Sequence, residues 1–215
     1  MNGTLDRFRS ASPRWFRWTF LAVAATLVLT LIGAGIYSWF GRREAAAQRA
    51  LGSVLAPAQR AIGSGQATDL DASATTLQQF LASHSKTRAS QQAWYVLGQV
   101  EYRRGRWDAA AAAFGEASRR DRGSIGTLSR LGQGYAHEAK GDLARALEVY
   151  QQALGGISPK DFLYGDLLLA KARVHEQSND SSGAIATYRR YLKDFPASDR
   201  SQDVKIRLAL LGADA

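Results

Sequence analysis

The chain has 215 residues, of which 46% are apolar, so it can form one domain with a packed core. It contains no cysteine, which excludes disulfide bonds, thiol catalysis and sulfur-ligated zinc. The formal net charge is +9, but the basic residues form no arginine-rich stripe with interleaved aromatic residues, so we expect no nucleic-acid partner. Anionic lipid headgroups or acidic segments of partner proteins account for such a charge equally well.

The first feature along the chain is an uncharged hydrophobic run behind a basic tail. Residues 1–17 include four arginines, and residues 18–41 include no charged side chain. The 23 residues from Trp18 to Phe40 would form a helix of roughly 34 Å, enough to cross a hydrocarbon core of about 30 Å. Aromatic residues stand at both ends, where membrane belts form. We predict a basic tail over residues 1–17 and a single transmembrane helix over residues 18–41.

The hydrophobic run has a competing interpretation as a cleavable signal peptide, since Gly33, Ala34 and Gly35 would suit a cleavage site. The run is, however, longer than the apolar core of about 7 to 15 residues that signal peptides contain. Arginines flank it on both sides, so their number does not orient it. A short tail with a free amino terminus follows the positive-inside rule, whereas a long domain translocates largely regardless of charge. We therefore expect the N-terminus in the cytoplasm and residues 42–215 outside it.

Residues 42–215 contain a repeated frame of small and aromatic residues. The frame begins with glycine in its first two copies, which are 36 residues apart, and a weaker third copy follows. The first copy consists of Gly105, Trp107, Ala110, Phe114 and Ala117, the second of Gly141, Leu143, Ala146, Tyr150 and Ala153, and the third of Ala184, Tyr188 and Tyr191. Such a period predicts stacked helical hairpins, because each hairpin needs the next one to bury its apolar face.

The first helix of each hairpin precedes its frame. Leu97 and Gly98 stand on one helical stripe before the first frame, and we align them with Leu131 and Gly132 before the second. A glycine at such a crossing lets a second helix approach closely. This alignment places two extra residues in the turn that leads to Gly141.

The repeat extends in both directions. Residues 81–93 align with residues 192–204 at an offset of 111, about three periods. Residues 42–62 and 71–83 therefore read as an earlier, degenerate hairpin, with its turn at residues 63–65 and a helix cap at Asp69 or Asp71. Residues 199–211 read as a lone closing helix. The fold class we predict is all-α: one N-terminal transmembrane helix, then over residues 42–215 a helical-hairpin solenoid of about eight helices.

The residues from Trp94 to Ala117 resemble the tetratricopeptide repeat, whose pattern combines tryptophan, Leu-Gly, glycine, alanine and aromatic residues in this order. The first hairpin departs from that pattern at Glu101, where the family has an aromatic residue. The resemblance implies a concave groove lined by the first helix of each hairpin, where proteins or peptides bind. The candidate groove residues are Gln92, Tyr95, Gln99, Tyr102 and Arg103 in the first hairpin, Ser129, Gln133 and His137 in the second, and Asp166, Leu169, Arg173 and Glu176 in the third.

No catalytic, cofactor or metal motif accompanies the repeats. The three histidines lie in different predicted helices, and none has a second ligand at helical spacing. The acidic residues occur singly, so no carboxylate pair is marked out for acid–base catalysis. We expect a protein that is not an enzyme and that takes no cofactor and no metal, although an enzyme with an unrecognised site is the alternative.

The order of tail, membrane helix and degenerate repeats is similar to the YfgM family, the ancillary subunit of the SecYEG translocon. The resemblance implies a scaffold in the inner membrane whose C-terminal domain is periplasmic, which contacts the translocon through its membrane helix and hands polypeptides to chaperones. Anchored repeat scaffolds of envelope assembly, division or cytochrome c maturation share this order of segments. A membrane-tethered regulator with a cytoplasmic array is a further alternative. Sequence alone does not identify the partner, because repeats of this kind encode a scaffold.

Overall fold

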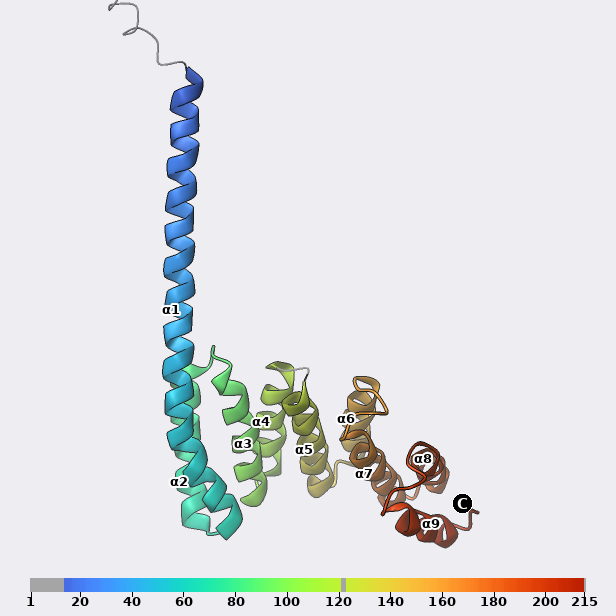
Figure 1. The fold of residues 1–215 in the computed structure, drawn as a ribbon. Helices are drawn as coiled ribbons and strands as arrows, with labels where there is room; N and C mark the ends of the chain where they lie inside the picture. The colour runs from blue at the N-terminus through green and yellow to red at the C-terminus, as the bar shows by residue number, and fades with distance from the viewer. Residues whose placement is uncertain (1–13, 121–122, 215) are drawn as a thin grey trace, which may run out of the picture. The chain divides into compact units, whose positions relative to one another are not determined.

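The computed structural model describes residues 14–120 and 123–214, and within these ranges it contains helices and no strand. Residues 1–13 of the predicted basic tail lie outside the described residues. The prediction of an all-α chain is confirmed (Figure 1). The helices are α1 (Arg14–Ser64), α2 (Ala67–His84), α3 (Ala89–Arg103), α4 (Trp107–Arg120), α5 (Ser124–Lys140), α6 (Leu143–Gly155), α7 (Tyr164–Gln177), α8 (Ser181–Asp194) and α9 (Ser201–Leu210).

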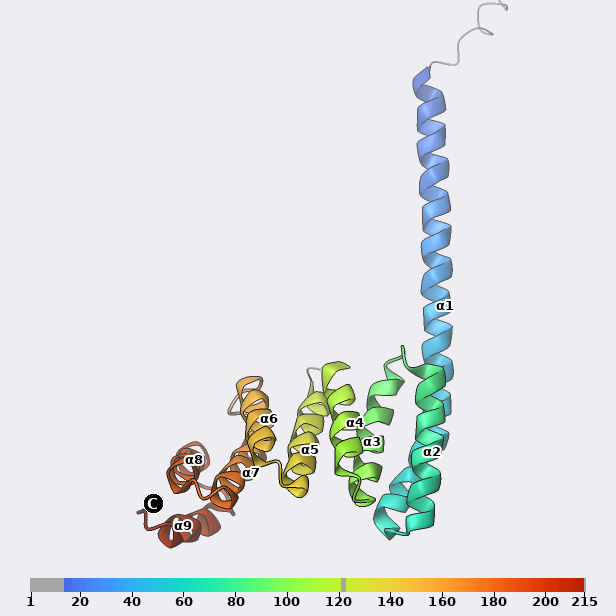
Figure 2. The ribbon, with the colours of Figure 1, turned by 180° about the vertical axis from the view of Figure 1, so that it is seen from behind.

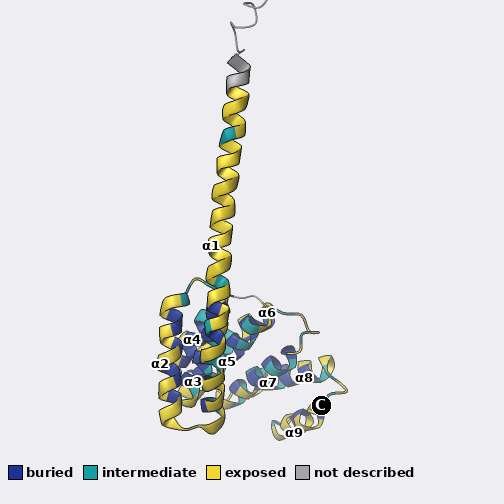
Figure 3. Ribbon diagram, turned by 60° about the vertical axis from the view of Figure 1, so that its left-hand side comes forward, coloured by how far each residue is buried: buried dark blue, intermediate teal, exposed yellow. Residues whose placement is uncertain are grey.

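The chain divides into two compact units, Met1–Ala46 and Ala47–Ala215. In the first unit, every large apolar side chain from Trp18 to Phe40 is between 49% and 83% exposed. The ribbon of this part of α1 is accordingly almost entirely in the yellow of exposed residues in Figure 3. Within the part of the chain that the structure describes, the segment Trp18–Ser64 of α1 is the one helix long and apolar enough to cross a membrane.

The second unit consists of helices that pack in chain order. Residues 47–64 of α1 and α2 form the first hairpin, α3 with α4, α5 with α6 and α7 with α8 form three more, and α9 follows as a single helix (Figures 1 and 2). Each helix has a buried stripe, because neighbouring hairpins cover it. Small side chains occupy the crossings: Ala110, Ala146 and Ala184 are completely buried.

Each hairpin turns at a residue in the left-handed conformation. Gly65, Gly105 and Gly141 have φ angles of +69°, +71° and +85°, and Asn179 has φ of +58°. Glycine adopts this conformation without steric cost, and asparagine tolerates it better than most residues. The last two turns are followed by Asp142 and Asp180, whose carboxylates accept a backbone N–H from the next helix. These two frames therefore begin with the same turn although their sequences differ.

The predicted cap of α2 is wrong. Gln66 precedes the helix and its side chain makes no capping hydrogen bond, while Asp69 lies in the first turn. Asp71 instead reaches Arg104, with 2.5 Å between its Oδ1 and Nη2. Arg104 also binds the carboxylate of Glu101 at 2.8 and 3.0 Å. The departure from the repeat pattern at Glu101 thus places a buried ion pair where an aromatic side chain would otherwise pack.

Candidate binding groove

Glycine packing shows which residues of successive hairpins are equivalent. A Cβ atom on Gly98 would lie 2.6 Å from Cδ1 of Phe114, and a Cβ atom on Gly134 would overlap the ring of Tyr150. Phe114 and Tyr150 are 36 residues apart, as are Gly98 and Gly134. Gly134 is therefore the equivalent of Gly98, and Gly132 approaches Phe114 from the following hairpin, with 2.7 Å from its Cβ position to Cζ.

The alignment of Gly98 with Gly132 is consequently wrong by two residues. No extra residues lie in the second turn, because the hairpins keep one spacing of 36 residues from Gly98 through Gly105 to Gly134 and Gly141. In this register, the residues of α5 that face the groove are shifted. The groove positions Tyr95, Gln99 and Tyr102 of α3 correspond to Leu131, Tyr135 and Glu138 of α5 and to Leu169, Arg173 and Glu176 of α7.

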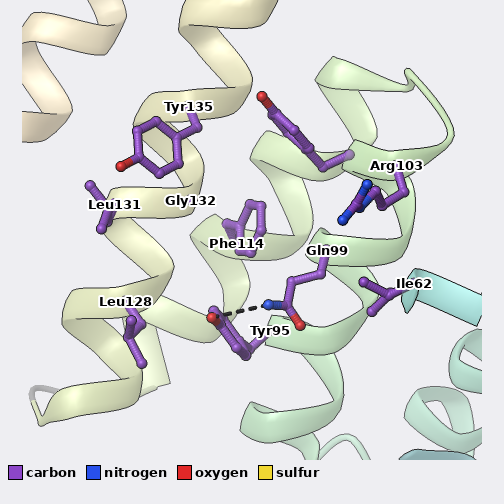
Figure 4. Close-up of a pocket in the computed structure, with 10 residues that line it drawn as sticks. Ile62, Tyr95, Gln99, Arg103, Phe114, Leu128, Leu131, Gly132 and Tyr135 are labelled. Carbon is purple, nitrogen blue, oxygen red and sulfur yellow. Dashed lines mark hydrogen bonds between the residues drawn. The ribbon is translucent and has the colours of Figure 1, made fainter. Parts of the chain in front are cut away.

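A cavity of about 370 Å³ opens between α3 and α5, with α4 at its base. Figure 4 shows Tyr95, Gln99 and Arg103 on one wall and Leu128, Leu131 and Tyr135 on the other, with the Phe114 ring between them. The residues that line it are Ile62, Tyr95, Gln99, Tyr102, Arg103, Phe114, Leu128, Leu131, Gly132 and Tyr135. Most of these side chains are apolar or aromatic, which is the usual lining of a ligand site. We call this cavity the N-terminal groove section.

The N-terminal groove section also contains polar side chains among its lining residues. Gln99 donates a hydrogen bond from Nε2 to the Tyr95 hydroxyl at 3.2 Å, and the Tyr95 and Phe114 ring centroids are 5.8 Å apart. Burial raises the pKa of Tyr95, and burial likewise raises the pKa of Tyr135 although Arg173 opposes it. Both phenols therefore stay protonated at neutral pH and can donate a hydrogen bond to a ligand.

Arg103 is the one charged side chain among the residues that line the N-terminal groove section. It is exposed, and no described residue forms an ion pair or a hydrogen bond with its guanidinium. An arginine in this state is available to a carboxylate, which it can bind through two parallel hydrogen bonds.

The groove positions of α5, α7 and α9 differ from those of the N-terminal groove section, because ion pairs join these helices. Nε of Arg173 lies 2.7 Å from Glu138 and Nη1 of Arg200 lies 2.5 Å from Asp166, while Arg207 is 3.4 Å from Glu176. They surround a cavity of about 180 Å³, lined by Leu169, Arg173, Glu176, Tyr188, Arg200, Asp203, Val204 and Arg207. We call this the C-terminal groove section. Its arginines already have carboxylate partners, which the N-terminal groove section does not provide.

Glu138 is the centre of this network. It accepts hydrogen bonds from Arg173 at 2.7 and 2.8 Å, from Gln177 at 2.8 Å and from the Tyr150 hydroxyl at 3.3 Å. Burial by itself would raise the pKa of Glu138, but these hydrogen bonds and the charge of Arg173 outweigh it and lower the pKa. Burial, with the nearby Glu138 charge, raises the pKa of Tyr150. At neutral pH the Glu138 carboxylate is therefore ionised, and its oxygens already accept hydrogen bonds from within the protein.

The structure separates the candidate groove residues into three groups. Tyr95, Gln99, Tyr102 and Arg103 line the N-terminal groove section, and Gln92 lies exposed on the same helix without lining it. Leu169, Arg173 and Glu176 line the C-terminal groove section, whereas Asp166 does not line it but pairs with its Arg200. Arg173 and Glu176 are likewise already in ion pairs.

Ser129, Gln133 and His137 are the third group, and they do not face the groove. Ser129 is completely buried and its Oγ donates to the Ile125 carbonyl at 2.7 Å. Gln133 and His137 line a different cavity of about 490 Å³, and burial lowers the pKa of His137. The two-residue error in register is the cause. The constant spacing of the turn glycines would have identified Leu131 and Tyr135 instead.

The N-terminal groove section offers apolar, aromatic and hydrogen-bonding side chains. No group of three or more histidine, aspartate or glutamate side chains within the described ranges could hold a metal ion. Aromatic rings, an amide, phenols and one unpaired arginine suit the backbone and side chains of a polypeptide.

Comparisons with known proteins agree with the repeat pattern. One family model of the tetratricopeptide repeat matches residues 59–125 and 104–162, and a second matches residues 166–198. A search of curated proteins found no match. The crystal structure of BtubC (BKLC) from P. vanneervenii is similar to this chain, with a TM-score of 0.54 and 14% sequence identity over 80% of this chain and 82% of that one. This identity supports a common fold and nothing beyond it. The repeats and the hairpin geometry together show that the chain is a tetratricopeptide repeat protein.

Proposed function

We propose that this protein is a membrane-anchored scaffold of the bacterial envelope that binds polypeptide segments in the N-terminal groove section. The observation that carries the proposal is the open cavity between α3 and α5, which combines an apolar lining with the unpaired Arg103. Tetratricopeptide repeats bind other proteins, and here the equivalent positions further along the array are already joined by ion pairs.

The lining predicts the chemistry of the bound segment. A leucine or aromatic side chain would fill the cavity against Phe114, and its burial contributes about 1.5 to 3 kcal/mol. An aspartate, a glutamate or a terminal carboxylate next to it would pair with Arg103, which at an exposed site contributes about 1 kcal/mol. The Gln99 amide and the tyrosine hydroxyls would bond the backbone of the segment.

The membrane anchor is the second part of the proposal. The exposed apolar side chains of residues 18–41 support insertion in a membrane. The positive-inside rule for a short basic tail is the reason for proposing the inner membrane with the N-terminus in the cytoplasm and the array in the periplasm. Similarity of organisation to the translocon subunit favours a helix that contacts the translocon and an array that receives emerging polypeptides or passes them to chaperones. The anchor restricts the array to the membrane plane, which raises its effective concentration near a membrane partner.

Binding is tested with the full chain in detergent micelles and two panels of short peptides. One panel pairs a leucine or aromatic residue with aspartate, and the other replaces the aspartate with asparagine. We expect the aspartate panel to bind about fivefold more tightly and the substitution Arg103→Gln to remove this difference. A double variant of Tyr95 and Tyr102 to Ala should weaken both panels. Phe162→Ala, which removes an aromatic side chain that is 68% exposed elsewhere, is the matched control.

The groove assignment would be contradicted if wild type bound both peptide panels equally and the double variant of Tyr95 and Tyr102 bound them as tightly as wild type does. Partners in cells are then identified by co-purification with the intact, membrane-extracted protein. Exchanging residues 18–41 for an unrelated membrane helix should lose a membrane partner and keep the soluble ones.

Orientation is tested with reporters fused after Ala215. A reporter active only outside the cytoplasm should be active, and one active only inside should be silent. The reverse result would place the array in the cytoplasm and favour a membrane-tethered regulator. A shortened mature chain cleaved near Gly35 would replace the anchor with a signal peptide.

A further inference from the structure

Tyr135 connects the two groove sections. It lies in α5, where its ring forms part of the wall of the N-terminal groove section (Figure 4). Arg173 of α7 lines the C-terminal groove section, and its guanidinium carbon lies 5.5 Å from the centroid of the Tyr135 ring. Among the described residues that line the N-terminal groove section, Arg173 does not occur. A ring that belongs to the first section is therefore in contact with a cation that belongs to the second.

The guanidinium that meets the Tyr135 ring is itself held in place. Nε and Nη2 of Arg173 donate to the two carboxylate oxygens of Glu138, at 2.7 and 2.8 Å. Two parallel hydrogen bonds of this kind fix the plane of a guanidinium as well as its position. Glu138 also accepts hydrogen bonds from Gln177 and from the Tyr150 hydroxyl, which hold the carboxylate. Arg173 is thus kept in one orientation against the Tyr135 ring.

A second ring restrains Tyr135. The ring centroids of Tyr135 and Tyr150 are 6.1 Å apart, and the ring planes meet at 71°, which is the edge-to-face arrangement that aromatic pairs prefer. Tyr150 lies in α6 and is completely buried, so its own position is fixed by the core. The Tyr135 ring therefore has two neighbours that do not move freely, a buried ring and a guanidinium bound to Glu138.

A fixed ring in the wall matters for affinity. When a polypeptide segment binds against a side chain that is free to change rotamer, the binding energy must also order that side chain. This ordering weakens binding roughly two- to tenfold for each side chain. A cation over the face of an aromatic ring opposes such movement, because the ring quadrupole attracts it. The contact with Arg173 thus keeps the wall of the N-terminal groove section in shape before anything binds.

We propose that Glu138 and Arg173 are positioning residues of the N-terminal groove section, because their ion pair holds the Tyr135 ring in its wall. This inference rests on the proposed function, since it concerns the same site. It makes the affinity of the N-terminal groove section depend on an ion pair that the bound segment does not touch.

The test uses the full chain in micelles with the aspartate and asparagine panels of peptides. Arg173→Gln should weaken the binding of both panels by the same factor, roughly two- to tenfold, because the Tyr135 ring must then be ordered on binding. The fivefold preference for aspartate should stay, because Arg103 still meets the carboxylate. Arg103→Gln has the opposite expected effect, since it removes the preference itself.

A second variant and a matched control accompany Arg173→Gln. Glu138→Gln is the milder change, because the Arg173 side chain is 44% exposed and stays solvated when its partner loses the charge. It should also weaken both panels by one common factor. Arg200→Gln is the matched control, since it removes a different ion pair at the C-terminal groove section, the one with Asp166, and should leave both affinities unchanged. Circular dichroism checks the fold of each variant.

A double-mutant cycle separates positioning from a general loss of stability. Tyr135→Leu keeps the wall apolar but leaves no ring for the guanidinium to hold. In this background, Arg173→Gln should have no further effect on the binding of either panel. A loss of affinity that came only from a weaker fold would appear equally with and without the ring.

Three results would overturn the proposal. Unchanged affinities in both Arg173→Gln and Glu138→Gln, or an equal loss in the Tyr135→Leu background, would remove the positioning role and leave the groove assignment intact. A changed aspartate preference in Arg173→Gln would show that Arg173 contacts the bound segment directly. If wild type bound neither panel, the proposed function would fail and this inference would fail with it.

Discussion

The ring of Phe114 allows the repeat register to be tested by adding single methyl groups. Gly98 in α3 and Gly132 in α5 meet this ring from two successive hairpins. Replacing either glycine by alanine would place a Cβ at 2.6 or 2.7 Å from a ring carbon, whereas ordinary contact begins near 3.4 Å. The ring would have to move by almost 1 Å, and movement away from one helix is limited by the other. We therefore expect both alanine variants to be destabilised by steric overlap.

The expected change in the free energy of unfolding follows from two opposing effects. Alanine in a helix interior is favoured over glycine by about 1 kcal/mol. Overpacking a rigid core costs about 1 to 3 kcal/mol, so Gly98→Ala and Gly132→Ala should each lose up to about 2 kcal/mol of stability after the helix-propensity gain is subtracted. Gly52 of α1 is the matched control, because a Cβ there meets nothing within 4 Å. Gly52→Ala should therefore be as stable as wild type or more stable by up to about 1 kcal/mol.

The free energy of unfolding is measured by chemical denaturation of the full chain in micelles, with circular dichroism as the signal. Thermal melting is a second assay, because a change of about 1 kcal/mol in a domain of this size shifts the melting temperature by about 2 to 4 °C. Phe114→Leu in the Gly98→Ala background should recover part of the loss, since the smaller side chain removes the overlap, and the double-mutant cycle measures this coupling. If Gly98→Ala and Gly132→Ala are stabilised like Gly52→Ala, the ring is not confined and the register is wrong.

The remaining predictions concern stability. Ala110→Leu should lose about 1 to 3 kcal/mol by overpacking, while Ala112→Leu on the exposed face of the same helix should be nearly neutral in denaturation. Removing Arg104 should cost about 3 to 5 kcal/mol because Glu101 stays buried without its partner, whereas removing Glu101 should cost less because Asp71 still pairs with Arg104. Replacing both Glu101 and Arg104 with Leu and Met should cost far less than removing Arg104 alone, and a double-mutant cycle distinguishes these outcomes. The pKa of Glu138 is lowered from its ordinary value of 4.5, so the ionised carboxylate stabilises the fold above that pH. The stability advantage of wild type over Glu138→Gln should therefore disappear as the pH falls from 4.5 through the lowered pKa. An advantage that does not depend on pH would contradict this origin.

Several features of this protein follow from the sequence alone. The uncharged run of residues 18–41 identifies a candidate membrane helix because length and polarity are local properties of the chain. The frames at Gly105 and Gly141 predict hairpins because their offsets repeat the helical period. Four of the candidate groove residues, Tyr95, Gln99, Tyr102 and Arg103, do line one cavity, since they share a face of α3.

Tertiary structure decided the register between hairpins. Leu131 with Gly132 and Gln133 with Gly134 are both candidate partners for the Leu97 and Gly98 stripe; the 36-residue spacing of the turn glycines favours the second pair, and the contact of Gly134 with Tyr150 decides it. That choice moves Ser129, Gln133 and His137 out of the groove and brings Leu131 and Tyr135 into it. The ion pairs between helices likewise depend on side chains 31 to 35 residues apart, such as Glu138 with Arg173. A periodic sequence specifies that helices stack, but the packing of particular side chains decides which face each helix turns to the groove and which charges remain unpaired there.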